Sequence, residues 1–276
     1  MKLTLVFSFL ILSSPMTSIW GQSRKHFYRK DNYYIGTSLG FGFTQPIIHE
    51  RYNILEPTPQ SAATDFDKKY EGLFQNVGGN YGLHFSFVYT RLFSVVCQPT
   101  FQTQRFSYMT NYSWSDSLSG GEVYKEFLHR QKISNLCIPI MGRLDFSSRK
   151  FSPFLQAGLS ADIVYFGSKI IYSDAYIDGE VDRKSAGHSN VAEITQHLNR
   201  FNVSLVAGAG VVYYHEDFAL SISGNIKYGM RPTINDSKRF EDFSGFAAPY
   251  LDVFDQVKLL NLDFLITAMV PLHKKW

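Results

Sequence analysis

Residues 151–165 read FSPFLQAGLSADIVY, and their side chains alternate between two kinds. Apolar side chains occupy one set of positions, at Leu155, Ala157, Leu159, Ile163 and Tyr165. Small or polar side chains occupy the other set, at Ser152, Gln156, Gly158, Ser160 and Asp162. A period of two is typical of a β-strand whose two faces meet different surroundings. The stretch therefore predicts a strand that is oily on one face and hydrophilic on the other.

Seven other segments repeat this alternation: Tyr33–Phe43, Tyr81–Tyr89, Phe93–Arg105, Lys132–Phe146, Phe201–Tyr213, Phe218–Tyr228 and Val257–Val270. Short connections (Thr90–Leu92, Ser147–Lys150 and Tyr214–Asp217) alternate strictly with four connections of more than 20 residues. Tight periplasmic turns and long external loops alternate in this way in outer-membrane barrels. We predict an all-β fold, an eight-stranded antiparallel up-and-down transmembrane β-barrel with three short periplasmic turns, four long extracellular loops and both termini in the periplasm.

The polarity of the two faces favours a membrane barrel over a water-soluble barrel or sandwich. A soluble barrel has an apolar interior, whereas the narrow polar faces here are rich in Gly, Ser, Gln and Asn and suit a packed, wet lumen. Aromatic residues of outward parity flank the three short turns, at Tyr89, Phe93, Phe146, Phe151, Tyr213 and Phe218. They predict an aromatic girdle at one membrane interface.

The two ends of the chain support the same location. Residues 1–21 combine Lys2 with the apolar run Leu3–Leu12, which is typical of a signal peptide and too short to span a bilayer as a helix. A basic periplasmic segment, residues 22–32, would then precede the barrel domain, residues 33–276. Trp276 is in phase with the outward positions of the last strand, as in an outer-membrane assembly signal.

Composition excludes several classes of function. Aromatic residues make up 16% of the chain and charged residues 18%, which argues against a disordered protein. A net charge of +3 gives no indication of nucleic-acid binding. The two cysteines lack the spacing of a zinc site, and we expect neither a metal nor another cofactor. By parity Cys97 faces lipid and Cys137 faces the lumen, so we predict that both thiols are free.

Three segments carry a resemblance to a known family: NLCIPIMGRLD (Asn135–Asp145), FSPFLQAGLSA (Phe151–Ala161) and AGAGVVY (Ala207–Tyr213). They resemble the outer-membrane β-barrel domain abundant in Bacteroidota, the group that includes PorT-type proteins. The resemblance covers essentially the whole mature chain and implies a barrel fold. It also implies, for some members, a place in the type IX secretion and gliding apparatus.

Charged residues divide into three sets by position. The loop cores are acidic, with 18 acids against 9 bases. Inward parity predicts a lumenal charge network, because charges inside a narrow barrel need partners; its members are Arg143, Asp145, Asp162, Lys227 and Asp263. Basic residues of outward parity lie at the external strand ends: Arg105, Lys132, Lys169 and Lys258. Two interpretations of this third set stay open, contacts with lipopolysaccharide phosphates or side chains that merely reach to water.

These features favour a structural or interaction role, through acidic external loops or the periplasmic end, with outer-membrane lipid, lipopolysaccharide and an envelope protein as partners. The loops are longer than hairpin closure requires. A narrow, porin-like solute channel is the alternative, although an eight-stranded barrel is only about wide enough for its own side chains. A lipid-modifying enzyme is a second alternative. His84 and Ser86 share the lumenal face, but the sequence holds no G-x-S-x-G motif, and we predict no catalytic residues.

Overall fold

The structure is a computed structural model that describes residues 33–52, 68–90, 92–115, 122–147, 150–177, 180–181, 188–239 and 252–272. The predicted signal peptide, the basic segment 22–32 and Trp276 lie outside the described residues. The wall strands are β1 (Tyr33–Glu50), β3 (Val77–Val88), β4 (Phe93–Cys97), β5 (Thr100–Ser115), β6 (Glu122–Asp145), β7 (Phe151–Ile177), β10 (Phe201–Tyr214), β11 (Ala219–Gly229) and β12 (Gln256–Pro271). Shorter elements are β2 (Lys69–Tyr70), β8 (Glu180–Val181), β9 (His188–Glu193) and the 3-10 helices η1 (Leu73–Gln75), η2 (Thr195–His197) and η3 (Asp236–Lys238).

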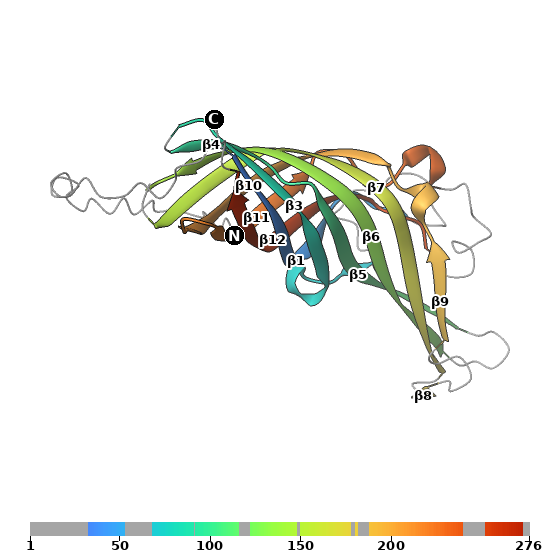
Figure 1. Ribbon diagram of the computed structural model, residues 1–276. Coiled ribbons are helices and arrows are strands. Elements are labelled where there is room, and N and C mark those ends of the chain that lie inside the picture. Colours follow the sequence, from blue (N-terminus) through green and yellow to red (C-terminus); the bar gives the residue numbers. More distant parts are fainter. Residues whose placement is uncertain are drawn as a thin grey trace, which may run out of the picture.

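The wall strands form a closed antiparallel circuit, because β1 pairs with β3 on one side and with β12 on the other (Figure 1). Within the described residues twelve strands are assigned, more than the eight predicted. The wall nevertheless has eight positions, since β4 and β5 occupy one position between β3 and β6. The remaining strands, β2, β8 and β9, pair only with β5 or β7. The predicted barrel class is confirmed.

Pro99 lies at the break between β4 and β5, and the neighbouring strand accommodates it through Gly82. A Cβ atom at Gly82 would lie 2.2 Å from the carbonyl oxygen of Pro99, so only glycine fits this close approach. The backbone pairing continues across the break, because Leu83 N–H donates to the Pro99 carbonyl at 2.9 Å. The interruption thus leaves the wall closed.

The predicted faces are confirmed along the part of the barrel next to the short turns. Leu39, Leu83, Leu159, Leu205 and Ile222 point outward and are about half exposed. The six predicted girdle residues also point outward around the turns, and Phe151 and Tyr213 pack with ring centroids 4.9 Å apart. A second group of outward aromatic rings lies further along the wall, where Tyr81 and Phe101 stack at 5.2 Å and Phe101 meets Tyr165 at 6.3 Å. We call the wall between these two groups the apolar band.

A β-bulge in β7 reverses the parity of the strand just beyond the apolar band. Against β6, Ser134 pairs with Phe166 and Asn135 with Val164, so Tyr165 is an extra residue. Tyr165 and Phe166 are consequently both exposed, and from Gly167 to Ile171 the odd-numbered residues are buried, the reverse of the alternation before the bulge. The prediction that Lys169 faces lipid is therefore wrong, since its side chain is fully buried inside the barrel.

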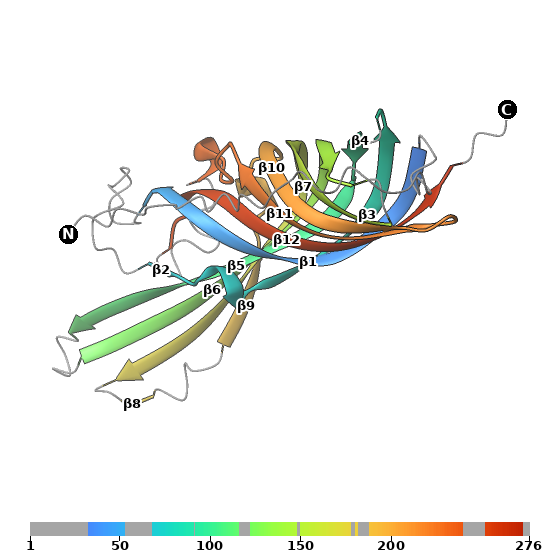
Figure 2. The same cartoon turned by 90° about the vertical axis from the view of Figure 1, so that its left-hand side faces the viewer.

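Two of the predicted long loops consist largely of strands. The connections expected at residues 106–131 and 166–200 contain the continuations of β5, β6 and β7, and β7 also pairs with β8 and β9. Figure 2 shows β5, β6 and β7 running side by side away from the barrel. We call this extension, residues 106–115, 122–131 and 168–177 with β8 and β9, the outer blade. The prediction failed because the polarity of the faces inverts there: Phe106, Tyr108 and Ile171 point inward and are buried.

The interior of the barrel is layered along its axis. At the level of the outer blade a dry cluster fills it, made of Phe106, Ile133, Val164, Ile194, Leu198, Ile234, Phe254, Val257 and Leu259. Below lies a polar layer that includes Gln102, Asp162 and Lys227. Next to the short turns a second apolar cluster follows, made of Tyr34, Val88, Phe154, Val212, Tyr214, Ala219 and Met269. Apolar side chains thus close the lumen on both sides of the polar layer.

Candidate functional site

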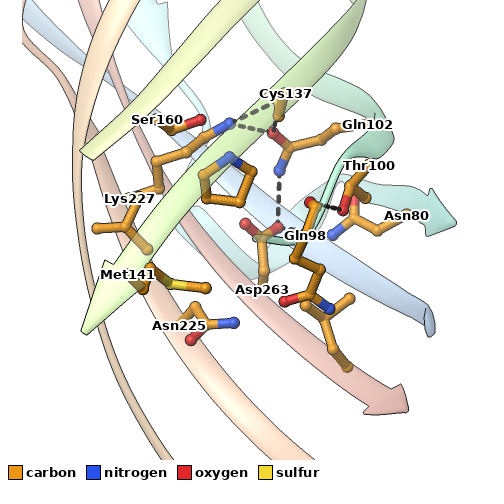
Figure 3. Close-up of a pocket in the computed structure, with 13 residues that line it drawn as sticks. Asn80, Gln98, Thr100, Gln102, Cys137, Met141, Ser160, Asn225, Lys227 and Asp263 are labelled. Atoms are coloured by element: carbon orange, nitrogen blue, oxygen red, sulfur yellow. Dashed lines mark hydrogen bonds between the residues drawn. The ribbon is translucent and has the colours of Figure 1, made fainter. Parts of the chain in front are cut away.

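The polar layer holds three of the five predicted lumenal charges, at Asp162, Lys227 and Asp263. The Lys227 ammonium lies 3.4 Å from the Asp162 carboxylate and also donates to the Gln102 side-chain oxygen. The Gln102 amide in turn donates to Asp263 at 2.8 Å, so one neutral side chain links the ammonium to the second carboxylate (Figure 3). Asn80 donates to the same Asp263 oxygen at 2.8 Å. Buried charges are tolerated when they are paired and hydrogen-bonded in this way.

Arg143 and Asp145 form a separate pair nearer the short turns. The Arg143 guanidinium donates to one Asp145 oxygen at 2.9 and 3.0 Å and stacks 3.7 Å from the centre of the Phe154 ring. The structure therefore buries all five predicted residues in the lumen but divides them between two clusters. The prediction of a single network is wrong, because the buried Met141, which packs with Val96 and Val206, lies on β6 between Cys137 of the polar layer and Arg143.

The cavities found in the polar layer are small. One, lined by Cys137, Lys227 and Asp263 among others, has a volume of about 40 Å³, and another beside Asp162 has about 20 Å³. A single water needs about 10–15 Å³ by this kind of measure, so these spaces fit a few waters.

A second buried charge cluster, which the alternation of the sequence does not predict, closes the outer mouth. We call it the mouth cluster: Lys68, Lys169, Asp252 and Asp255, with Tyr70, Tyr108 and His129. Asp252 accepts from Lys169 and from the Tyr108 hydroxyl at 2.6 Å, and its other carboxylate oxygen lies 3.0 Å from the Lys68 ammonium. Lys68 also lies 3.1 Å from Asp255. Asp252 and Asp255 were counted among the acids of an external loop core; both are buried.

Electrostatics within the mouth cluster favour the ionised carboxylate. Burial alone would raise the pKa of Asp252, but the ammonium groups of Lys169 and Lys68 outweigh burial and hold the pKa well below its usual range. Burial likewise opposes a charged Lys68, yet Asp252 and Asp255 keep the pKa of Lys68 above its ordinary value. The cluster is therefore a set of charges that depend on one another.

Two external connections pack across the mouth and fix the lid formed by residues 252–255. The Asn199 side chain donates to the carbonyls of Pro232 and Ile234 at 2.9 and 3.0 Å. His197 is buried between the Lys238 carbonyl, 2.8 Å from its Nδ1, and the Phe254 ring. Buried side chains therefore occupy the opening that a wide channel would need.

The other predicted rim cations lie on the outside of the wall. Arg105 and Lys132 are exposed and are direct cross-strand partners on β5 and β6. Lys258 is half-buried on β12, with its ammonium 6.0 Å from the centre of the Tyr228 ring. Arg130, which falls within the long connection expected at residues 106–131, extends the same outward face of β6.

The remaining candidate groups, the two cysteines and the residues around His84, do not assemble a reactive site. Both cysteines are free, Cys97 on the outer face and Cys137 in the lumen, as predicted. His84 and Ser86 are buried in the wall. The carboxylates considered as their partners bond elsewhere, Asp162 to Ser204 and Lys227, and Asp263 to Asn80 and Gln102. Among the described residues neither ring nitrogen of His84 has a hydrogen-bond partner, so these residues assemble no triad around it.

Comparison with known families agrees with the closed barrel and its outward apolar band. A family model described as outer membrane protein beta-barrel domain matches residues 21–235. The chain belongs to this family. A search among curated proteins found no match. In this outer-membrane barrel the apolar band spans the lipid, and the location is the cell outer membrane.

Solved structures similar to this outer-membrane barrel have low sequence identity. The outer membrane protein OprG from Pseudomonas aeruginosa matches with a TM-score of 0.45 and 11% identity, over 90% of this chain and 100% of that chain. Neisserial surface protein A matches with a TM-score of 0.35 and 11% identity, over 87% and 97%. The attachment invasion locus protein Ail of Yersinia pestis matches with a TM-score of 0.32 and 12% identity, over 87% and 98%. Among the described residues, no helix is long and apolar enough to cross a membrane.

Proposed function

We propose that this outer-membrane barrel is a non-catalytic anchor that presents the outer blade to a protein partner. One observation carries the proposal: β6 has 24 residues and β7 has 27, whereas crossing a membrane takes about 9–11 residues in a tilted strand. The additional length is ordered, paired strand rather than loop. An ordered sheet is a better recognition surface than a connection that only closes a hairpin, because it loses less conformational entropy on binding.

The sealed lumen favours this role over the alternative of a narrow solute channel. The dry outer cluster and the inner apolar cluster lie on either side of the polar layer. Hydrated ions or polar solutes would have to cross both. Planar-bilayer recordings of the purified protein test this point, and a large, stable conductance would overturn it.

The orientation proposed for the barrel puts the blade outside the cell and both termini in the periplasm. The first residues of β1 pair with the last of β12, at the same end as the three short turns. Short turns are periplasmic in barrels of this kind. Membership of the PorT-type Bacteroidota group, and a place in a type IX secretion or other envelope complex, are proposals that rest on the resemblance of residues 135–145, 151–161 and 207–213.

Contacts with lipid and the absence of catalysis complete the proposal. Arg105, Lys132 and Lys258 would meet the phosphates of lipopolysaccharide at the outer rim, with the lipids of the outer membrane around the apolar band. Catalysis is disfavoured because His84 is only 3% exposed, so that a lipid substrate has no path to it. Profiling of lipid A by mass spectrometry, with and without the protein, tests that statement.

Trimming the blade tests the proposed partner binding. Asn111 and Glu126 are cross-strand partners, so residues 112–125 can be replaced by a two-residue Asn-Gly turn without changing the register. In vivo photo-cross-linking from a probe at Glu126 should capture a partner with the full blade and lose it in the trimmed variant. A matched control replaces the two turn residues Glu216 and Asp217, at the opposite end, by Asn-Gly, which keeps the pairing of Tyr214 with Ala219. Unchanged cross-links in the trimmed variant would contradict the proposal.

A further inference from the structure

A hollow of about 700 Å³ opens on the outward side of the wall where β5, β6 and β7 pass into the outer blade. Its basic lining consists of Arg105, Arg130 and Lys132, and the segment 71–77 that contains η1 forms its other side. This volume falls within the range of about 300–1,000 Å³ that is usual for small-ligand sites. Neither the charge network of the lumen nor the mouth cluster includes these three cations.

The β-sheet register brings the three cations together. Arg105 stands directly opposite Lys132 on β6. Arg130 lies two residues before Lys132 on the same face of that strand. Directly opposed side chains have Cβ atoms about 4.5–5.5 Å apart, and like charges so placed repel each other. Within the described part of the chain none of the three forms a salt bridge. An anionic ligand would remove this repulsion.

The single acid in the lining, Glu71, forms no salt bridge with the three cations among the described residues and is held by neutral donors instead. Glu71 accepts from the Asn76 amide at 3.0 Å and from the Ser107 hydroxyl. These contacts tie the segment 71–77 to β5 and keep the hollow open between them. On the far side, the Arg130 guanidinium stacks 5.2 Å from the centre of the Tyr172 ring, which orients its donors.

The position of the hollow indicates what fills it. Arg105 lies four residues beyond Phe101, one of the outward rings that end the apolar band, and Val77 in the lining is half exposed. Aromatic rings of this kind mark the interface between acyl chains and headgroups. The cations therefore lie at headgroup level, with apolar surface directly below them.

We propose that this hollow binds the phosphorylated headgroup of an outer-leaflet glycolipid. The inference rests on the proposed function for its orientation, and it deepens the lipid contact proposed there. Arg105 and Arg130 match phosphate oxygens with paired donors, Lys132 adds a point charge, and Val77 and Ile170 meet the apolar part of the lipid. Lys169 has no part in the site because it faces the interior, and Lys258 lies on β12, on the opposite wall of the barrel.

The test measures binding of bis-phosphorylated lipid A to the full-length protein in detergent micelles by native mass spectrometry. The variant R105Q/R130Q/K132Q should bind about 100-fold more weakly, from the usual contribution of a cation near an anionic headgroup layer. The variant R200Q/R231Q is the control: it removes two exposed cations beside β10 and β11 that do not line the hollow, and its affinity should stay close to that of wild type.

Three results would overturn the proposal. Equal affinity of wild type and the R105Q/R130Q/K132Q variant for lipid A would show that the three cations do not form the binding site. Equal binding of dephosphorylated lipid A would show that acyl chains alone are recognised, and full competition by millimolar inorganic phosphate would show a free-anion site. Heat-modifiable gel mobility shows whether each variant is folded. If the triple variant does not fold, the single variant R130Q takes its place, with an expected loss of lipid A affinity of about fivefold.

Failure of this inference is distinguishable from failure of the proposed function. The blade-trimmed variant retains all three cations, and the Gln variants retain the whole blade. Loss of lipid A binding with intact partner cross-links, or the reverse, therefore separates the two.

Discussion

Two regions of the same wall turn their apolar side chains in opposite directions. In the apolar band, β7 turns Leu155 and Leu159 outward to lipid and keeps Ser160 and Asp162 inside. Beyond the bulge at Tyr165, the same strand turns Ile171 inward, and the dry outer cluster fills the barrel. The surrounding solvent accounts for the difference: lipid accepts apolar side chains on the outside, whereas water drives them to the interior.

The comparison also explains why each region buries charge differently. In the apolar band Lys227 reaches Asp162 and Gln102 within a layer of amides and hydroxyls. In the outer region Asp252 and Lys169 are surrounded by the rings of Tyr108 and Phe254, with Lys68 as the second cation. The outer region has fewer polar side chains that could replace a lost charge partner. Its stability is therefore more sensitive than that of the apolar band to the loss of one charged residue.

Removal of Asp252 is expected to have the largest effect. Asp252→Ala leaves Lys169 and Lys68 buried with too little negative charge, and breaking a buried pair costs about 3–5 kcal/mol. Hydrogen exchange should show loss of protection in residues 252–255 and at the outer ends of β6 and β7. The control is Asp217→Ala, whose carboxylate is 87% exposed in a turn and should change stability by less than about 0.5 kcal/mol. Equal protection in both variants would mean that the mouth cluster does not hold the lid.

An identical substitution in each region should sharpen the contrast. Leu159, in the apolar band, and Val191, on β9 of the outer blade, are 52% and 65% exposed. Arginine at Leu159 should cost about 2–4 kcal/mol because it enters hydrocarbon. Arginine at Val191 enters water and should change stability by no more than about 0.5 kcal/mol. Reversible unfolding in liposomes measures both, and similar losses would remove the distinction between the regions.

The sequence was informative where one solvent acts on a whole strand segment. All eight wall positions, the aromatic girdle and the inward placement of Lys227 and Asp263 follow from simple alternation. The bulge could not be predicted, because Tyr165 and Phe166 are both aromatic and either of them could occupy the outward position. The outer blade was missed because its faces have the polarity of a soluble protein. Asp252 and Asp255 enclose two apolar residues, Val253 and Phe254, in the run DVFD, which is the signal that could have revealed the lid.

Acidification should have a smaller effect on the same mouth cluster. The pKa of Asp252 in the folded protein is lower than its ordinary value of about 3.9, so its stabilisation is present above that pH and is lost as the pH falls. At pH 3 the expected loss is about 1 kcal/mol. Protection factors of residues 252–255, compared at pH 6 and pH 3, measure it. Asp252→Asn retains His129 and both lysines, so its pH dependence should be weaker by that amount; an equal dependence would contradict the assignment.

Accessibility of single spin labels along β7 tests the inverted polarity of the two regions most directly. In a C97A/C137A background, labels would be placed one at a time at residues 155–171 of the liposome-embedded protein. We predict that odd positions up to 163 are accessible to dissolved oxygen, that the phase changes once at residues 165–166, and that even positions beyond it are accessible to a water-soluble nickel complex. Labels at 167, 169 and 171 should be shielded from both reagents. An alternation that continues unbroken through residue 171, or oxygen access at 156, 160 and 162, would contradict the account.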